Sequence, residues 1–398
     1  MPSANYRALL RIPGAATFFL AAVVGRVGLA MTGIGIVWLV HARTGSFADA
    51  GLVTGCFAVA DALGGPQIGR LTDRFGQRRV LTCALAAHAG AVGLLFCGGP
   101  LTVAGAILAG ASLPQLSALS AARWTALLRG TPDEAALPRA YTLEALANGL
   151  SFLAGPALVS AVGAAGHPRL GSLLAAALVI GGGLAFAAQR RTEPPVAGHA
   201  ERHRAGRGLL RPAFVRLVAL SAALGIYFGA LQVSVTAYAV GRGTPDAAPL
   251  LYMVSNCTSL VAGWAYGARH WTAPPLRQRA LATAGLALAC LPLTVVDAPA
   301  AVAGCLALTG LAVPVLLVLF NVLTEIAVPR AVLTQAFTWL GSASAAGSAG
   351  AAALAGRAVD TAGPHGGFGV GVAAALAMVA LAAPGRLRAA ARPARVRR

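Results

Sequence analysis

The sequence predicts an all-α membrane protein with about twelve transmembrane helices in two pseudo-symmetric six-helix bundles. The first observation is composition, because 57% of the 398 residues are hydrophobic and only 11% are charged, against about 25% charged residues in soluble domains. Such a chain cannot cover itself with polar groups, so its apolar exterior must face lipid. The other two observations are the long apolar runs and the alternating distribution of arginine between them.

The apolar runs are long enough to cross a bilayer, which takes about 20 mostly apolar residues. The first run is too long for a signal-peptide core, so we expect it to remain as the first spanning helix. Turn signals such as Gly98-Gly99-Pro100 and Asp297-Ala298-Pro299 separate adjoining runs. The expected spans are 14–40, 47–69, 80–98, 101–127, 140–164, 168–188, 213–240, 247–268, 278–296, 299–324, 331–356 and 364–384.

Arginine provides the orientation, because the chain has no lysine and its arginines fall mostly in alternate loops. Of the 31 arginines, 26 lie on one side of the expected membrane, four lie on the other, and Arg26 lies within a span. Positively charged loops stay in the cytoplasm. We therefore expect a multi-pass protein of the bacterial cell (inner or plasma) membrane with both termini cytoplasmic. The net charge of +19 orients the chain and does not indicate a nucleic-acid partner.

The longest polar stretch divides the chain near its middle. It predicts an N-terminal bundle (1–189), a cytoplasmic linker (190–212) and a C-terminal bundle with a basic cytoplasmic tail (213–398). The halves echo each other, since Leu9-Leu10-Arg11 precedes the first span and Leu209-Leu210-Arg211 precedes the seventh. A duplicated six-helix unit is the architecture of one class of secondary transporters.

No constellation typical of an enzyme is found in the sequence. The six cysteines lie in apolar runs without a CxxC pair, which indicates buried core residues rather than a metal site. There is no supported Ser/His/Asp set and no Walker-type phosphate loop. We expect no enzymatic activity, no metal and no cofactor, and an ion gradient rather than ATP as the energy source.

The loop between the second and third spans carries the most specific motif. It contains Gly69, Asp73, Arg74, Gly76, Arg78 and Arg79. This loop resembles the G-x-x-x-D-R-x-G-R-R/K signature of the major facilitator superfamily, with Gln77 where the pattern commonly has arginine. The resemblance implies two bundles that rock around a central small-molecule site. It also implies a gating latch, for which Asp73 needs a helix N-terminus or an arginine as partner.

Two further segments bear on this resemblance. The equivalent loop of the second half, 263–270, keeps glycines but has no acid. The fifth span contains Gly155-Pro156, which looks like the core of a motif of drug/proton antiporters, although an ordinary packing kink is an equal alternative. The fourth span lacks the arginine that many drug antiporters carry in residues equivalent to 103–112.

Charged side chains within spans are functional candidates because each costs a few kcal/mol in the bilayer. At about 1.5 Å per residue, Arg26 and Asp61 both lie near the middle of the membrane. We expect them to pair, or to share a substrate or proton site. The alternative is an ion pair with a purely structural role.

Two other acids lie near the cytoplasmic face of their spans. Glu144 is expected to pair with Arg123 or Arg139 as a gate or scaffold, and Glu325 lies close to Arg330 in the sequence. Both are also candidate transport or proton residues. Uncharged polar side chains that can face a cavity, or bond neighbouring helices, are Gln232, Asn256 and Asn321.

The sequence therefore favours a monomeric secondary transporter whose partners are protons, a small-molecule substrate and the lipid bilayer. The apolar spans favour proton-coupled efflux of a hydrophobic or amphipathic compound. The alternative is uptake of a polar metabolite such as a sugar or organic acid, for which we find few polar residues in the relevant spans. A non-transporting membrane sensor is less favoured, since neither the linker nor the tail is long enough for a signalling domain.

Overall fold

The computed structural model describes residues 6–196, 198, 205–244, 247–269 and 271–383, so the basic tail lies largely outside the described residues. All regular secondary structure in these ranges is helical, which confirms the predicted fold class. The first half begins with the short helix α1 (Tyr6–Arg11). Its spanning helices are α2 (Ala15–Thr44), α3 (Phe47–Phe75), α4 (Gln77–Leu95), α5 (Pro100–Ala111) with α6 (Leu116–Leu128), α7 (Leu137–Ala164) and α8 (Pro168–Ala188).

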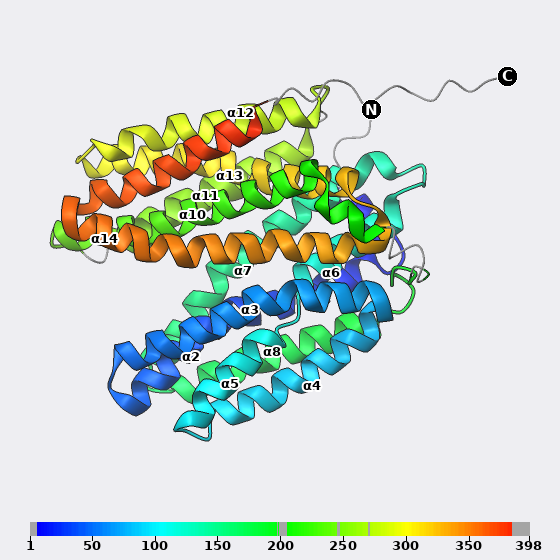
Figure 1. Ribbon diagram of the computed structural model, residues 1–398, viewed down its shortest axis with the longest axis horizontal. Helices are drawn as coiled ribbons and strands as arrows, with labels where there is room; N and C mark the ends of the chain where they lie inside the picture. The colour runs from blue at the N-terminus through cyan, green and yellow to red at the C-terminus, as the bar shows by residue number, and fades with distance from the viewer. Residues whose placement is uncertain (1–5, 197, 199–204, 245–246, 270, 384–398) are drawn as a thin grey trace.

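The second half repeats this pattern after the linker, whose last turn is the 3₁₀ helix η2 (Arg207–Leu210). Figure 1 shows the two groups of helices as an upper and a lower layer, with α3 and α14 facing each other between them. The spanning helices of this half are α10 (Pro212–Gly241), α11 (Ala247–Ala268), α12 (Pro275–Cys290), α13 (Pro299–Ala327) and α14 (Leu333–Ala382).

The span expected at 101–127 corresponds to one stretch that is long and apolar enough to cross a membrane, Pro100–Leu128, but its helix is broken in the middle. Helix α5 ends at Ala111 and α6 begins at Leu116. Pro114 lies in the break, and proline both lacks an N–H and clashes with the preceding helical turn. The freed backbone groups find local partners: the Leu116 N–H donates to the Pro114 carbonyl at 2.9 Å, and the Ser112 hydroxyl donates to the Leu108 carbonyl at 2.6 Å.

The last helix, α14, holds the two final spans. Its helical segments meet at Ala362 and Gly363, where Gly363 has a φ of 66° that side chains rarely adopt. Seven helical stretches of the described chain are long and apolar enough to cross a membrane, and the stretch Arg330–Ala382 is one of them.

The arginine-rich loops meet at one end of the molecule and close it. Arg123, in the interior of α6, donates to the Gln189 carbonyl after α8, and the Arg78 N–H at the start of α4 donates to Glu193 in the linker at 2.9 Å. Gly208 of η2 lies against Pro329 before α14. These contacts bring loops of both halves together at this end.

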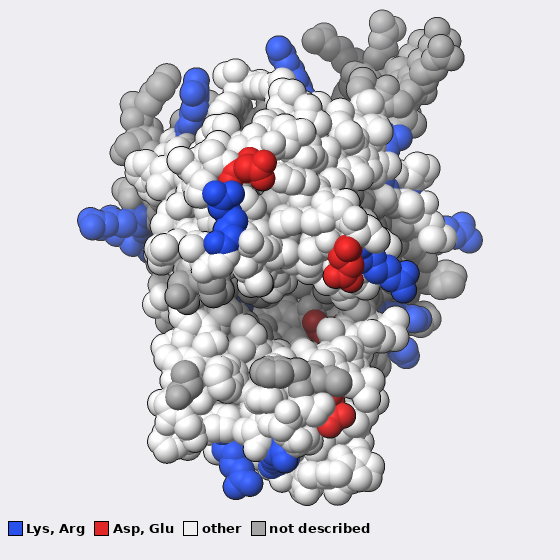
Figure 2. Space-filling view, turned by 90° about the vertical axis from the view of Figure 1, so that its left-hand side faces the viewer, with Lys and Arg blue, Asp and Glu red and all other residues white. Residues whose placement is uncertain are grey.

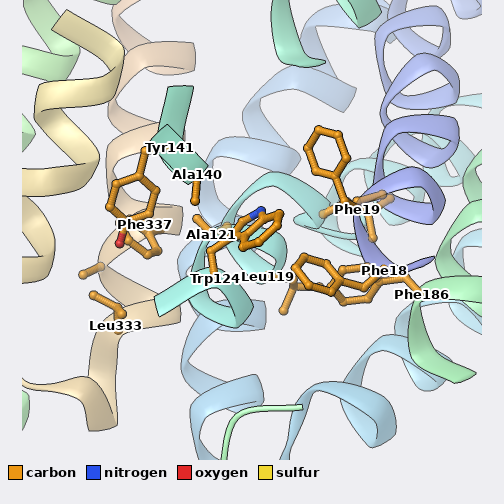
Figure 3. Close-up of a cluster of buried hydrophobic side chains, with 14 of the residues drawn as sticks. Phe18, Phe19, Leu119, Ala121, Trp124, Ala140, Tyr141, Phe186, Leu333 and Phe337 are labelled. Carbon is orange, nitrogen blue, oxygen red and sulfur yellow. The ribbon is translucent and has the colours of Figure 1, made fainter. Parts of the chain in front are cut away.

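An aromatic cluster fills the interior of this closed end (Figure 3). Trp124 of α6 packs against Phe18 of α2, with ring centroids 5.0 Å apart. Tyr141 of α7 packs edge-on against Phe337 of α14 at 6.0 Å, so the cluster crosses from one half to the other. Burying large aromatic side chains contributes strongly to packing, and this cluster therefore holds α6 and α7 in fixed positions.

Candidate functional site

The opposite end of the molecule is hollowed. Figure 2 looks onto that end, and a central hollow lies between the upper and lower parts, which are the C-terminal and N-terminal halves of Figure 1. The structure is therefore closed at its arginine-rich end and open at the other.

Arg26 of α2 pairs with Glu144 of α7, not with Asp61 as the sequence suggested. The same carboxylate accepts hydrogen bonds from the Ser120 hydroxyl at 2.6 Å and from the Trp124 indole N–H at 2.8 Å. Arg26 and Glu144 are 2% and 4% exposed. Glu144 thus pairs with neither Arg123 nor Arg139 in these contacts, because α7 carries it toward α2 and α6.

This ion pair is enclosed within the first half. A buried pair is costly to form, and removing one partner leaves an uncompensated charge. Because all four side chains are buried, Arg26 and Glu144 are shielded from the hollow in this state.

Asp61 lies at the middle of α3 and has a different environment. Its carboxylate accepts a hydrogen bond from the Gln115 amide N–H at 2.9 Å, and no cationic side chain among the described residues pairs with it. Gln115 lies in the break between α5 and α6. Asp61 is partly exposed, which makes it an accessible carboxylate without a cationic partner.

The position of Asp61 follows from the contacts between α3 and α14. These run from Asp73 through Gly69 to Gly65, where an added Cβ would lie 2.9 Å from the Ser342 hydroxyl oxygen. Asp61 lies one turn of α3 beyond Gly65, on the side away from the closed end.

Asp73 has the kind of partner that the motif predicts, the N-terminus of a helix. Its carboxylate accepts the Gln335 N–H at 2.9 Å in the first turn of α14. A carboxylate at this position satisfies a free N–H and interacts favourably with the helix dipole. Asp73 lies four residues beyond the expected span 47–69. Burial raises the pKa of this carboxyl to about 7, while hydrogen bonds from Thr334 and Gln335 oppose the rise.

Gln77, the position that departs from the family pattern, has a structural role. It is buried, and its amide oxygen accepts a hydrogen bond from Arg123 Nε at 2.7 Å. The Arg123 guanidinium also lies 3.8 Å from the centroid of the Phe186 ring. An arginine at position 77 would place a second guanidinium against the first, so glutamine fits this environment better.

The halves are joined at the closed end by a second charged contact. Arg129, after α6, forms an ion pair with Glu325 of α13 at 2.7 Å. Arg330, which the sequence placed beside Glu325, is not its direct partner, because Arg129 approaches from the other half. The pair is partly exposed at Arg129.

Gly155 and Pro156 lie within the continuous helix α7. A Cβ at Gly155 would lie 2.7 Å from the Ala30 Cβ and 2.9 Å from the Val27 carbonyl oxygen of α2. The glycine therefore allows α2 and α7 to approach closely, which is the approach that joins Arg26 to Glu144.

The other polar candidates are not brought into this cluster. Gln232 and Asn256 are exposed and Asn321 is partly buried. The Thr236 hydroxyl donates to the backbone carbonyl of Gln232 at 2.9 Å, which leaves the Gln232 amide side chain outside this contact.

Sequence reasoning missed several residues that complete the site. Gln115 was available as a signal, since a polar residue follows a proline within an apolar run. Ser120 and Trp124 gave no signal, because a serine and a tryptophan in a spanning helix are ordinary packing residues. Their role as hydrogen-bond donors depends on the direction in which the Glu144 side chain points.

The comparisons with known proteins agree with this architecture. The model of the family described as Major Facilitator Superfamily matches residues 18–352. Comparison with curated protein sequences finds no significant match.

Solved structures share the fold at low sequence identity. The human organic anion transporter MFSD10 has a TM-score of 0.70 and 16% identity, covering 96% of this chain and 100% of its own. A bacterial homologue of the iron transporter ferroportin in an outward-facing state has a TM-score of 0.75 and 13% identity, covering 93% and 98%. The transporter FucP in its outward conformation has a TM-score of 0.68 and 14% identity, covering 94% and 98%. The chain belongs to the Major Facilitator Superfamily and is a membrane transporter, not an enzyme.

Proposed function

We propose that this transporter uses the proton gradient to export a hydrophobic or amphipathic organic compound by alternating access. The observation that carries the proposal is Asp61, a partly exposed carboxylate at the middle of α3 without a cationic partner among the described residues. An ionised carboxylate in the membrane is costly unless it is paired. Its stable forms are therefore the protonated acid or a complex with a cation.

Protonation of Asp61 offers a means of coupling. In the open state the Asp61 carboxylate exchanges protons with water in the hollow. The neutral amide of Gln115 holds the carboxylate in place through a hydrogen bond. Closure around Asp61 is favoured when the group is neutral, since desolvating a charge is disfavoured. Arg26 and Glu144 do not carry the coupling proton in this proposal. Their charges neutralise each other, so the ion pair lets α2 and α7 move as one unit.

Transport in proteoliposomes tests this proposal. The probes are ethidium as an amphipathic cation, bromosulfophthalein as an amphipathic anion and glucose as a polar compound, each with and without an imposed pH gradient. We expect the wild type to accumulate an amphipathic probe only with the gradient, and Asp61→Asn to lose this dependence while still exchanging the probe.

Matched variants separate coupling from folding. Thr82→Val removes an exposed hydroxyl of α4 that donates to the Arg78 and Arg79 carbonyls of its own helix, and it is expected to keep gradient-driven accumulation. Accumulation by Asp61→Asn equal to that of the wild type would contradict the coupling role. Gradient-driven transport of glucose, without transport of either amphipathic probe, would contradict the substrate class.

A further inference from the structure

A cavity of about 420 Å³ lies at the arginine-rich end, where the two halves and the linker meet. Its walls come from the last turns of α3, from η2 and from the start of α14. It therefore touches Asp73 and Gln335, the two residues that join α3 to α14.

Three arginines surround this cavity, and the part of the chain that the structure describes provides no anionic partner for them. Arg70 and Arg74 belong to α3 and Arg207 belongs to η2, and all three are exposed. Among the described residues, none of them forms an ion pair, and the Arg74 guanidinium lies over the Phe75 ring, 4.8 Å from its centroid. The one acid in the wall, Asp73, is already hydrogen-bonded to the N-terminus of α14. The cavity therefore has an excess of positive charge suited to a phosphate group.

The cavity also has an apolar side. Leu210 belongs to its wall and is 78% exposed, with Leu209 beside it. Arg70 follows directly after the expected span 47–69, so the cavity lies at the level of the lipid headgroups. Unpaired arginines together with exposed leucine at this level favour a ligand that has both a phosphate and an apolar part.

We propose that this cavity binds the headgroup of an anionic phospholipid and that the bound lipid stabilises the closed arginine-rich end. The walls belong to both halves, so the cavity is complete only while α3 and α14 are in contact. A ligand that binds one conformation better shifts the population toward that conformation. The lipid thereby adds to the contact between Asp73 and Gln335.

Lipid titration of the purified protein tests the binding. Dioleoylphosphatidylglycerol is added in detergent, with dioleoylphosphatidylcholine and inorganic phosphate as separate arms, and bound lipid is counted by native mass spectrometry. We expect the anionic lipid to bind the wild type. We expect the double variant Arg70→Gln/Arg207→Gln to bind it roughly 25-fold more weakly, a factor of about five for each arginine.

The control is Arg7→Gln/Arg277→Gln, which removes two exposed arginines, one of α1 and one of α12, that are not part of the cavity. It has the same change in charge as the double variant and is expected to retain wild-type binding. If the control weakens binding of the anionic lipid as much as the double variant does, the cavity is not the binding site. Equal binding of the two lipids, or displacement of the anionic lipid by inorganic phosphate at the same concentration, would overturn the assignment to an anionic lipid.

The effect on conformation needs a separate measurement. Thr338 lies against Gly69 and is 1% exposed, so a cysteine at this position reports opening of the contact between α3 and α14. Thr338→Cys is made in a background without the six native cysteines and labelled with a hydrophilic maleimide in vesicles. Anionic lipid should slow labelling several-fold, and the same rate in vesicles of phosphatidylcholine alone would overturn the stabilising role.

Discussion

The closed end has two seams between the halves, and they are held in different ways. In the first seam, α3 meets α14: Gly69 lies against Thr338, and Asp73 accepts the Gln335 N–H. In the second seam, α11 meets α7: Gly267 lies against Thr142, where an added Cβ would be 2.6 Å from the threonine methyl group. At the second seam the Tyr6 hydroxyl donates to the Trp264 carbonyl, and Gly267 stands at the position that Asp73 has in the first.

The common feature of the two seams is close packing at glycine. The loop 263–270 has kept glycines of the motif while losing the acid, and α11 still packs against α7. Close packing between helices at small residues needs no charge. The acid of the first seam is therefore an addition that links closure to electrostatics, and the two seams should respond differently to substitution.

The largest difference between the two seams is expected when their equivalent glycines, Gly69 and Gly263, are replaced by alanine. A Cβ at Gly69 would collide with the Thr338 hydroxyl and lie 2.9 Å from the Gln335 Cα, whereas at Gly263 the nearest atoms are 3.2 Å away. Gly69→Ala should destabilise the closed state by about 1–3 kcal/mol, and Gly263→Ala by under about 1 kcal/mol. Maleimide labelling of Thr338→Cys measures the opening. Similar labelling rates in the two glycine variants would contradict the difference between the seams.

Removal of the acid should have the next largest effect. Asp73→Ala leaves the first turn of α14 without its carboxylate, which costs about 1 kcal/mol at a helix N-terminus. We expect opening of the first seam to increase about fivefold in the same labelling assay. Asp73→Asn keeps an acceptor oxygen and should recover part of the loss. If the alanine and asparagine variants both label like the wild type, Asp73 does not act as a latch.

Hydropathy and arginine distribution predicted nearly all of the helices, because lipid exposure imposes both patterns on the sequence. The partner of Arg26 was not predicted. Depth along a helix places Asp61 level with Arg26, and Glu144 nearer the cytoplasmic face, and it does not give the direction in which each side chain points. That direction depends on the close approach of α7 to α2 at Gly155, which is a property of packing between distant segments.

The break in the fourth span, by contrast, has a cause that is visible in the sequence. Pro114 was present in the apolar run and is a sufficient physical cause of the interruption. Length and hydropathy predict the span 101–127, which the structure has, but they do not locate a break within it. Gln115 and its bond to Asp61 follow from this break.

The smallest effect is expected in the second seam, at its tyrosine. The Tyr6 hydroxyl donates to the Trp264 carbonyl at 3.0 Å, at an exposed position. Tyr6→Phe removes this bond while keeping the aromatic ring, so the closed state should lose about 0.5–1 kcal/mol. Thermal unfolding in detergent, compared with Asp73→Ala, measures the difference. Because packing rather than polarity holds this seam, an effect of Tyr6→Phe larger than that of Asp73→Ala would show that the second seam, too, depends on its polar contact.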